Sequence, residues 1–335
     1  MTATLLYAEP ITTDNPFEDE IFDGDVVVHR MFVAELSDIP ASIRAEVDGL
    51  MLFRHFFRRE QFDLFPKLRA LVRLGVGYDR IDRKVAEQRG VVVCNVPDYA
   101  TSEVSDHAIA LALGLSRGLF LHHDRQRRLP PAPWAPAESP LLRRFSDLTF
   151  ACVGMGRIGM AAGLKAKALG ADVVFYDPFL PSGIEIALGV RRAASLDALL
   201  RQANILSLHT PLTPDTRNMI GEREIALLPP DAIIINTARG PVLALDAVCN
   251  ALKSGHLAGV GLDVVPVEPP VEPLPELIQA VRNRDDWVEG RVVITPHVAF
   301  CSPAASTDLH RKAVATMRAA LEGKRPYNVI SADQP

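Results

Sequence analysis

The fold of this chain is decided by residues 149–159, TFACVGMGRIG. This stretch starts as an apolar strand, turns at Gly154 and Gly156, and continues into a helical pattern that runs to Leu169. Glycines at this spacing permit a tight turn, close approach of the backbone to a pyrophosphate, and close packing of the helix on the strand. The free N–H groups at the start of such a helix bind anions. The combination predicts a dinucleotide-binding α/β domain.

Asp177 supplies the second half of this fingerprint. It follows the predicted strand Asp172–Tyr176 and lies about 20 residues beyond the glycines, as the motif requires. A carboxylate here binds ribose hydroxyls and repels a 2′-phosphate, and Pro178 follows rather than an arginine that would accept that phosphate. The sequence therefore favours NAD over NADP, although Asp177 alone could be a turn residue or a helix N-cap. The predicted cofactor-binding residues of this segment are Gly154, Gly156, Arg157, Ile158, Gly159 and Asp177.

Strands and helices alternate over the rest of the chain, and the continuous apolar runs are typical of parallel strands buried on both faces. The predicted strands are Thr4–Ala8, Val26–Phe32, Gly49–Phe53, Leu68–Leu74 and Val91–Val96, then Leu148–Val153, Asp172–Tyr176, Ile205–His209, Ala232–Asn236, Leu257–Leu262 and Val292–Thr295. The predicted helices between them are Ile39–Val47, Ile81–Gln88, Ile158–Leu169, Leu196–Ala203 and Leu245–Ser254. This alternation predicts two doubly wound α/β layers.

Four segments lie outside this alternation. A single long amphipathic helix is predicted over Thr101–Leu121. Pro130–Pro140 and Pro266–Trp287 are proline-rich, so both are predicted to be irregular insertions. A final helix over Ser306–Leu321 is too short to begin a domain, and we expect it to pack on the first α/β layer.

The bulk properties exclude several classes of protein. A length of 335 residues fits two domains, and a net charge of −5 argues against nucleic acid as the main partner. The cysteines are dispersed without paired spacing, which favours reduced thiols over a disulfide framework or a zinc site. No basic and apolar leader and no bilayer-length apolar run occur in the sequence. We therefore expect a cytoplasmic protein without a membrane partner.

Arg239, Glu268 and His297 each follow one of the later predicted strands. Ligands of doubly wound sheets bind at the carboxyl ends of the strands. Taken singly, the arginine could pair with a structural carboxylate, the glutamate could be a solvated loop acid, and the histidine could be a surface residue. Their joint occurrence at strand ends favours a catalytic site.

With these motifs in this order, the sequence resembles the D-isomer-specific 2-hydroxyacid dehydrogenase family over nearly its full length. The shared segments are Val72–Asp82, Asn95–Pro97, the glycine fingerprint, His209–Thr213 and the three segments that carry Arg239, Glu268 and His297. Within the family it looks most similar to the branch of the C-terminal binding proteins, through Phe175–Pro178, Thr295–Phe300 and a phenylalanine in place of their tryptophan.

The resemblance implies a fold and a reaction. Residues 1–99 and 299–335 would form a flavodoxin-like substrate-binding domain, into which a Rossmann NAD-binding domain of residues 100–298 is inserted. The reaction would be hydride transfer at the 2-carbon of a small D-2-hydroxy acid or 2-keto acid. The family also implies a homodimer through the NAD domain. We expect no metal, because the adjacent His122 and His123, which with Asp124 could suggest one, point in different directions on a helix.

The resemblance also assigns chemical roles. His297 would take the hydroxyl proton as the hydride leaves, or return it during reduction, and the ordinary histidine pKa of about 6.5 suits both directions. Glu268 would bond the other ring nitrogen and favour the protonated imidazole. Arg239 would hold the substrate carboxylate and polarise the 2-carbonyl, for which a planar guanidinium is better suited than lysine.

Further contacts follow from the same resemblance. Asp263 would accept a hydrogen bond from the nicotinamide carboxamide. The remaining predicted cofactor-binding residues are His209, Thr210, Pro211, Thr216, Thr237 and Ala238, and the predicted substrate-binding residues are Phe53, Arg54, Val76, Gly77, Arg239 and Phe300.

Two other functions compete with this prediction. One is an NAD(H)-sensing interaction protein, similar to corepressors, which would need a partner groove on the first domain. The intact Arg239, Glu268 and His297 favour catalysis over that role. The other is formate dehydrogenase, whose histidine pairs with glutamine, so Glu268 counts against it.

Overall fold

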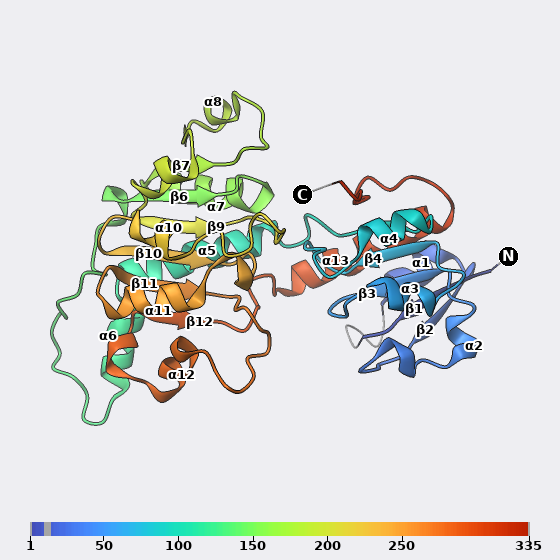
Figure 1. The fold of residues 1–335 in the computed structure, drawn as a ribbon, viewed down its shortest axis with the longest axis horizontal. Coiled ribbons are helices and arrows are strands. Elements are labelled where there is room, and N and C mark those ends of the chain that lie inside the picture. The colour runs from blue at the N-terminus through green and yellow to red at the C-terminus, as the bar shows by residue number, and fades with distance from the viewer. Residues whose placement is uncertain (1, 10–14, 334–335) are drawn as a thin grey trace. The chain divides into compact units, whose positions relative to one another are not determined.

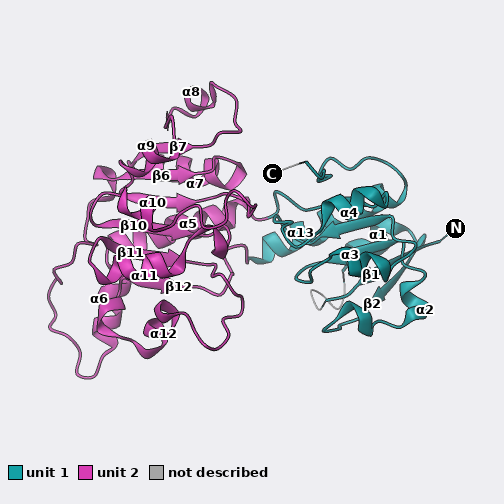
Figure 2. Ribbon diagram, viewed as in Figure 1, with its two compact units in different colours: residues 1–99, 302–335 teal, residues 100–301 magenta. Residues whose placement is uncertain are grey.

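The computed structural model describes residues 2–9 and 15–333, which divide into two compact units (Figure 2). Unit 1 comprises Met1–Tyr99 and Ser302–Pro335, and unit 2 comprises Ala100–Cys301. Each unit contains one sheet of parallel strands, so the predicted α/β class with two parallel sheets is confirmed. Residues 299–301, which were predicted in the first domain, belong to unit 2 in this division, where the N–H of Ala299 donates to Asp263.

Unit 1 has a five-stranded sheet in the order β2-β1-β3-β4-β5 (Figure 1). Its strands are β1 (Ala3–Tyr7), β2 (Val26–Arg30), β3 (Gly49–Leu52), β4 (Ala70–Arg73) and β5 (Val92–Cys94). Its helices are α1 (Phe17–Phe22), α2 (Ala41–Arg44), α3 (Arg59–Asp63), α4 (Arg83–Gln88) and α13 (Pro303–Leu321). The strand order reverses between β1 and β3, which gives this sheet a topological switch point.

The apolar runs of unit 1 are buried strands, as their composition predicts. All four residues of β3 are buried. Leu50 and Leu52 pack into a core that also holds Phe57. Gly49 alternates with them and faces α13, where a Cβ would lie only 2.6 Å from the Sδ of Met317. The last helix of the chain is therefore part of unit 1.

Unit 2 has a seven-stranded parallel sheet in the order β12-β11-β10-β9-β6-β7-β8. Its strands are β6 (Thr149–Val153), β7 (Asp172–Tyr176), β8 (Arg191–Arg192), β9 (Ile205–Leu208), β10 (Ala232–Asn236), β11 (Leu257–Leu262) and β12 (Val292–Ile294). Its helices are α5 (Thr101–Ser116), α6 (Leu119–Arg127), α7 (Arg157–Ala168), α8 (Ile184–Leu188), α9 (Leu196–Leu200), α10 (Glu222–Ala226), α11 (Leu245–Lys253) and α12 (Glu276–Asn283). The order reverses between β6 and β9, so a ligand would bind at the carboxyl ends of these two strands.

Two apolar cores cover the two faces of this sheet. One contains residues of α5 and α7, such as Ala108 and Ala162. The other contains residues of α9, α10 and α11, such as Leu199, Ile225 and Val248. The sheet is thus buried on both faces, which explains why its strands are continuous in apolar character.

The prediction of one helix over Thr101–Leu121 is wrong. The chain forms α5 and α6, bent by 65° at the break, because Gly118 adopts a left-handed conformation with a φ of 63°. Among the described residues no single helix is long and apolar enough to cross a bilayer, and α5 with α6 meets that test of length and composition only as a bent pair.

The insertion at Pro266–Trp287 is also more ordered than predicted. It contains α12, whose Leu277, Ile278 and Ala280 are buried in the core of unit 2. The surrounding prolines hid this apolar face from the sequence pattern. The sequence also missed the short elements α1, α3, α8, α10 and β8, which are too short to show a clear period.

Candidate active site

The glycine turn joins β6 to α7 at the switch point of unit 2. Gly154 has a φ of 87°, and a Cβ there would lie 2.8 Å from the carbonyl oxygen of His209. A Cβ at Gly159 would lie 2.2 Å from the carbonyl oxygen of Gly154. Both glycines are therefore required by packing within the protein.

Gly156 differs from these two glycines. It is the N-cap of α7, and a Cβ there would meet no described protein atom within 4 Å. Packing within unit 2 therefore does not require glycine at this position. The bare backbone and the first N–H groups of α7 fit the approach of a pyrophosphate.

Asp177 lies beside this turn, directly after β7. Its Oδ2 accepts a hydrogen bond from the N–H of Met155 at 2.9 Å, and its Oδ1 accepts one from the N–H of Phe179 at 3.0 Å. The carboxylate thus shapes the turn and places a negative charge at the end of the strand. The observed bonds make Asp177 a turn residue, and the charge beside the glycine turn also fits the predicted ribose site.

Three buried polar atoms near the switch point have no hydrogen-bond partner among the described residues. They are Nδ1 of His209, Oγ1 of Thr210 and Oγ1 of Thr237. Unpaired buried polar atoms are costly, so they point to a polar ligand that pairs with them. All three belong to the predicted cofactor-binding set, and together with Gly156 they fit a dinucleotide.

His209 is held as a neutral ring. Burial lowers the pKa of His209 to about 4, and its Nε2 lies 2.9 Å from the hydroxyl of Ser207. A neutral histidine offers a donor or an acceptor to a ligand without adding charge.

The other predicted cofactor-binding residues shape the neighbouring loops. The hydroxyl of Thr216 donates to the carbonyl oxygen of Pro211 at 2.7 Å and accepts from the N–H of Thr213 at 2.8 Å. The N–H of Ala238 donates to Oδ1 of Asn236 at 3.0 Å. Thr216 therefore holds the loop after β9, a role that the sequence did not reveal.

His297 and Glu268 form a hydrogen-bonded pair. Nδ1 of His297 lies 2.6 Å from Oε2 of Glu268. Oε1 of Glu268 accepts a second hydrogen bond from the N–H of Val265 at 3.0 Å. An ionised carboxylate only accepts, so Nδ1 carries the hydrogen and Nε2 is the nitrogen that can exchange a proton with a substrate.

Glu268 is held in its ionised form. Burial alone would raise the pKa of this carboxyl, whereas the hydrogen bond and charge of His297 lower it. The N–H of Val265 and the charge of Arg239 add to the lowering, so the pKa of Glu268 lies below its ordinary value.

Arg239 approaches the pair from the loop after β10. Its Nη1 donates to the carbonyl oxygen of Ala238 at 2.8 Å. A Cβ at Gly240 would lie 2.0 Å from the carbonyl carbon of Val265, so only glycine lets this loop pass so close to the segment before Glu268. The structure therefore brings Arg239, Glu268 and His297 together, as the sequence predicts.

Asp263 is buried directly after β11, and its carboxylate is bonded to the chain itself. Oδ1 accepts from the hydroxyl of Thr295 at 2.6 Å and from the N–H of Val298 at 2.9 Å. Oδ2 accepts from the N–H of Ala299 at 3.0 Å. A contact to the nicotinamide carboxamide stays a prediction, while the observed bonds fix the loop that carries His297.

The substrate-binding residues predicted in unit 1 follow two adjacent strands, β3 and β4. Phe53 and Arg54 come after β3, and the cations of Arg54 and Arg73 lie 5.2 and 5.8 Å from the centre of the Phe53 ring. Val76 and Gly77 come after β4, where the side chain of Asn95 donates to the carbonyl oxygen of Val76 at 2.6 Å.

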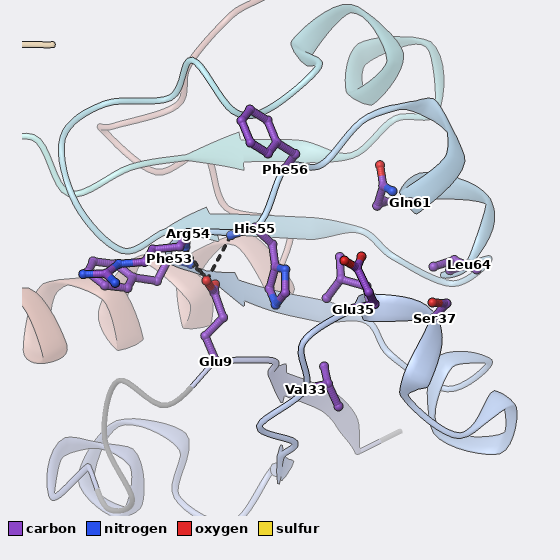
Figure 3. A pocket seen from close by; sticks show the side chains of 11 residues that line it. Glu9, Val33, Glu35, Ser37, Phe53, Arg54, His55, Phe56, Gln61 and Leu64 are labelled. Atoms are coloured by element: carbon purple, nitrogen blue, oxygen red, sulfur yellow. Dashed lines mark hydrogen bonds between the residues drawn. The ribbon is translucent and has the colours of Figure 1, made fainter. Parts of the chain in front are cut away.

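A pocket of about 560 Å³ lies beside the loop after β3 (Figure 3). The carboxylate of Glu9 accepts hydrogen bonds there from the N–H groups of Phe53, Arg54 and His55. All the residues that line this pocket belong to unit 1. Glu9 shapes the loop that carries two predicted substrate contacts, and nothing in the sequence pattern pointed to it.

Phe300 is the predicted substrate-binding residue that lies in unit 2 beside His297. The ring of Phe300 meets the ring of His297 edge-on, with 6.2 Å between their centres. Within residues 2–9 and 15–333 no group of three or more histidine, cysteine, aspartate or glutamate side chains could hold a metal ion.

Comparisons with known proteins agree with these features. Residues 109–299 match the family model described as D-isomer specific 2-hydroxyacid dehydrogenase, NAD binding domain. A glyoxylate reductase of Korarchaeum cryptofilum is 35% identical over 277 residues, which cover 81% of this chain and 79% of that protein.

Two solved structures share the fold over almost the whole chain. One is a D-lactate dehydrogenase from Aquifex aeolicus with NAD and lactic acid, with 27% identity, a TM-score of 0.82 and coverage of 98% of both chains. The other is an NADPH-dependent glyoxylate/hydroxypyruvate reductase from Sinorhizobium meliloti with NADP and malonate, with 26% identity, a TM-score of 0.81 and coverage of 99% of this chain and 98% of that one.

Proposed function

Because the chain belongs to the D-isomer specific 2-hydroxyacid dehydrogenase family, we propose that it reduces a small 2-keto acid, or oxidises the matching D-2-hydroxy acid, with His297 as the proton-transfer residue. The family is one of NAD-dependent oxidoreductases, and NAD is the cofactor. The observation that carries the assignment of His297 is the 2.6 Å bond from its Nδ1 to Glu268.

The proton chemistry follows from this bond. Glu268 fixes the imidazole orientation, so that Nε2 gives a proton to the 2-keto oxygen during reduction and removes it during oxidation. The negative charge of Glu268 stabilises the imidazolium that oxidation creates. Bound NADH supplies the hydride in the reduction.

Arg239 would hold the substrate. Its guanidinium presents paired N–H donors, which match a carboxylate and also polarise a neighbouring carbonyl. Its charge helps to lower the pKa of the Glu268 carboxyl, which supports the proposal that both groups belong to one site. The roles of Phe53, Arg54, Val76, Gly77 and Phe300 in substrate binding stay predictions from the resemblance.

The preference for NAD over NADP is part of the proposal. Asp177 stands where a carboxylate would meet the ribose hydroxyls and repel a 2′-phosphate. A homodimer formed through unit 2 and a cytoplasmic location are likewise expectations from the family and the composition.

The test is the variant His297→Ala. We expect kcat for keto-acid reduction to fall about a hundredfold or more, since general acid catalysis contributes on that scale. The Kd for NADH, measured by fluorescence, stays within about twofold because His297 lies outside the glycine turn. An unchanged kcat would contradict the proposal that His297 transfers the proton.

The alternative of an NAD(H)-sensing interaction protein gains support only if the wild-type protein binds NADH and turns over no 2-keto acid.

A further inference from the structure

We propose that His107, on α5, is a positioning residue for the reaction, which acts through Thr295 and Asp263 on the loop that carries His297. We call residues 295–299 the histidine loop. The inference rests on the proposed catalytic role of His297. His107 and Thr295 are 188 residues apart in sequence, and neither stands among the predicted site residues.

The histidine loop is fixed by one buried carboxylate. Only 1% of the Asp263 side chain is exposed. Its two oxygens accept from the Thr295 hydroxyl and from the N–H groups of Val298 and Ala299. The carbonyl oxygen of Asp263 also accepts from the N–H of His297 at 2.8 Å. Asp263 thus binds the loop on both sides of the catalytic ring.

His107 completes this arrangement through the hydroxyl of Thr295. Nε2 of His107 lies 3.0 Å from Oγ1 of Thr295. That hydroxyl has one hydrogen, which it gives to the acceptor-only carboxylate of Asp263 at 2.6 Å. Its oxygen must therefore accept from His107, so Nε2 of His107 carries a hydrogen. The order of donation is His107 to Thr295 to Asp263.

His297 needs such support because its backbone is strained. Its φ is 55°, in the left-handed region that residues with a side chain rarely adopt. Such a conformation persists only where the surroundings impose it. If the loop relaxed, Nε2 of His297 would shift relative to the substrate, and small misplacements of a reacting group cost large factors in rate.

The position of His107 separates this role from a general contribution to folding. Helix α5 is anchored by Ala108, Leu111 and Ala112, which are buried in the core of unit 2. The side chain of His107 remains 24% exposed. A change at His107 therefore leaves the packing of α5 in place while it removes the donor to Thr295.

The experiment compares two disruptive variants with two conservative ones. His107→Leu and Thr295→Val each break the relay, by which we mean the hydrogen-bond chain from His107 through Thr295 to Asp263. We expect each variant to lower kcat about tenfold or more and to keep the Kd for NADH within about twofold of wild type. Thr295→Ser keeps the hydroxyl, and His107→Gln keeps a donor near the position of Nε2. Both conservative variants should retain a kcat within about threefold of wild type. His123→Leu, on the exposed side of α6, is the matched control.

The double variant His107→Leu/Thr295→Val tests whether the two residues act in series. We expect it to lose no more kcat than the worse single variant, because one relay is broken in each case. Multiplying losses would overturn the inference. Wild-type kcat in both His107→Leu and Thr295→Val would also overturn it. So would a loss of kcat that is proportional to the drop in Tm and that is equally large in Thr295→Ser. If His297→Ala loses kcat in the same assay, such results refute the inference alone; if His297→Ala keeps kcat, the proposed function itself fails.

Discussion

His297 shows how backbone and side-chain interactions converge on one residue. Its left-handed φ of 55° costs about 1 kcal/mol or more, and the hydrogen bonds of the histidine loop to Asp263 offset that cost. Its ring is held by the hydrogen bond to Glu268 and has an edge contact with Phe300. The backbone strain and the ordering of the ring therefore occur in the residue that we propose as the proton-transfer group.

The charge of Glu268 should set the pH dependence of reduction. Reduction needs a protonated His297, and a neighbouring carboxylate favours that form. We expect Glu268→Gln to move the alkaline midpoint of kcat/KM for keto-acid reduction to lower pH, because the variant loses the negative charge beside the ring. The pH profile of NADH oxidation measures this shift.

The matched control is Glu272→Gln, an exposed glutamate on the same insertion. Because the pKa of Glu268 lies below its ordinary value of 4.5, its carboxylate is charged throughout that profile. Any stability that the pair contributes is complete above pH 4.5 and is lost as the pH falls through the lowered value. An alkaline midpoint that stays in place would show that Glu268 does not act on His297 electrostatically.

Asp177 should govern the choice between the two nicotinamide cofactors. We expect Asp177→Ala to lower the ratio of Kd for NADPH to Kd for NADH about tenfold or more, because the charge that repels a 2′-phosphate is gone. Fluorescence titration with both cofactors measures the ratio. Asp172→Ala, at the other end of β7, is the control because that carboxylate pairs with Arg191. A ratio equal to that of wild type would remove Asp177 from the ribose site.

At the scale of elements, the turn between β6 and α7 contains glycines with different functions. A Cβ at Gly159 would overlap the carbonyl of Gly154, whereas a Cβ at Gly156 meets only open space. We expect Gly156→Ala to keep the Tm of the cofactor-free protein within about 2 °C and to weaken NADH binding about tenfold or more. Gly159→Ala should lower both Tm and affinity.

Thermal unfolding and NADH titration of the two variants decide between the two functions. Normal NADH affinity in Gly156→Ala would contradict the assignment of this turn to the pyrophosphate. A loss of Tm in that variant equal to the loss in Gly159→Ala would mean that Gly156 is a packing glycine as well.

Elements with a long, regular pattern were predictable, and interrupted ones were not. The predicted ranges of β7, β10 and β11 agree with the observed ones, because each is a continuous apolar run between clear breaks. The break between α5 and α6 was missed because apolar residues continue across Gly118. Helix α12 was missed because prolines surround its apolar face.

At the scale of the whole chain, the sequence predicted two parallel sheets and the approach of Arg239, Glu268 and His297. Those three residues follow parallel strands, whose carboxyl ends meet at one edge of a sheet. The contact between His107 and Thr295 could not be predicted, because it depends on how α5 crosses the sheet rather than on any local pattern. Glu9 was missed because it follows β1, whereas the N–H groups of Phe53, Arg54 and His55 that it binds follow β3.

The measurement that tests the central claim most directly is steady-state oxidation of NADH by the wild-type protein. Its substrates would be a panel of 2-keto acids that includes glyoxylate, hydroxypyruvate, phenylpyruvate and a methylthio-2-keto acid. The account predicts turnover with at least one of them, and a D-2-hydroxy acid as the product wherever the product is chiral. Tight NADH binding without turnover of any 2-keto acid would contradict it.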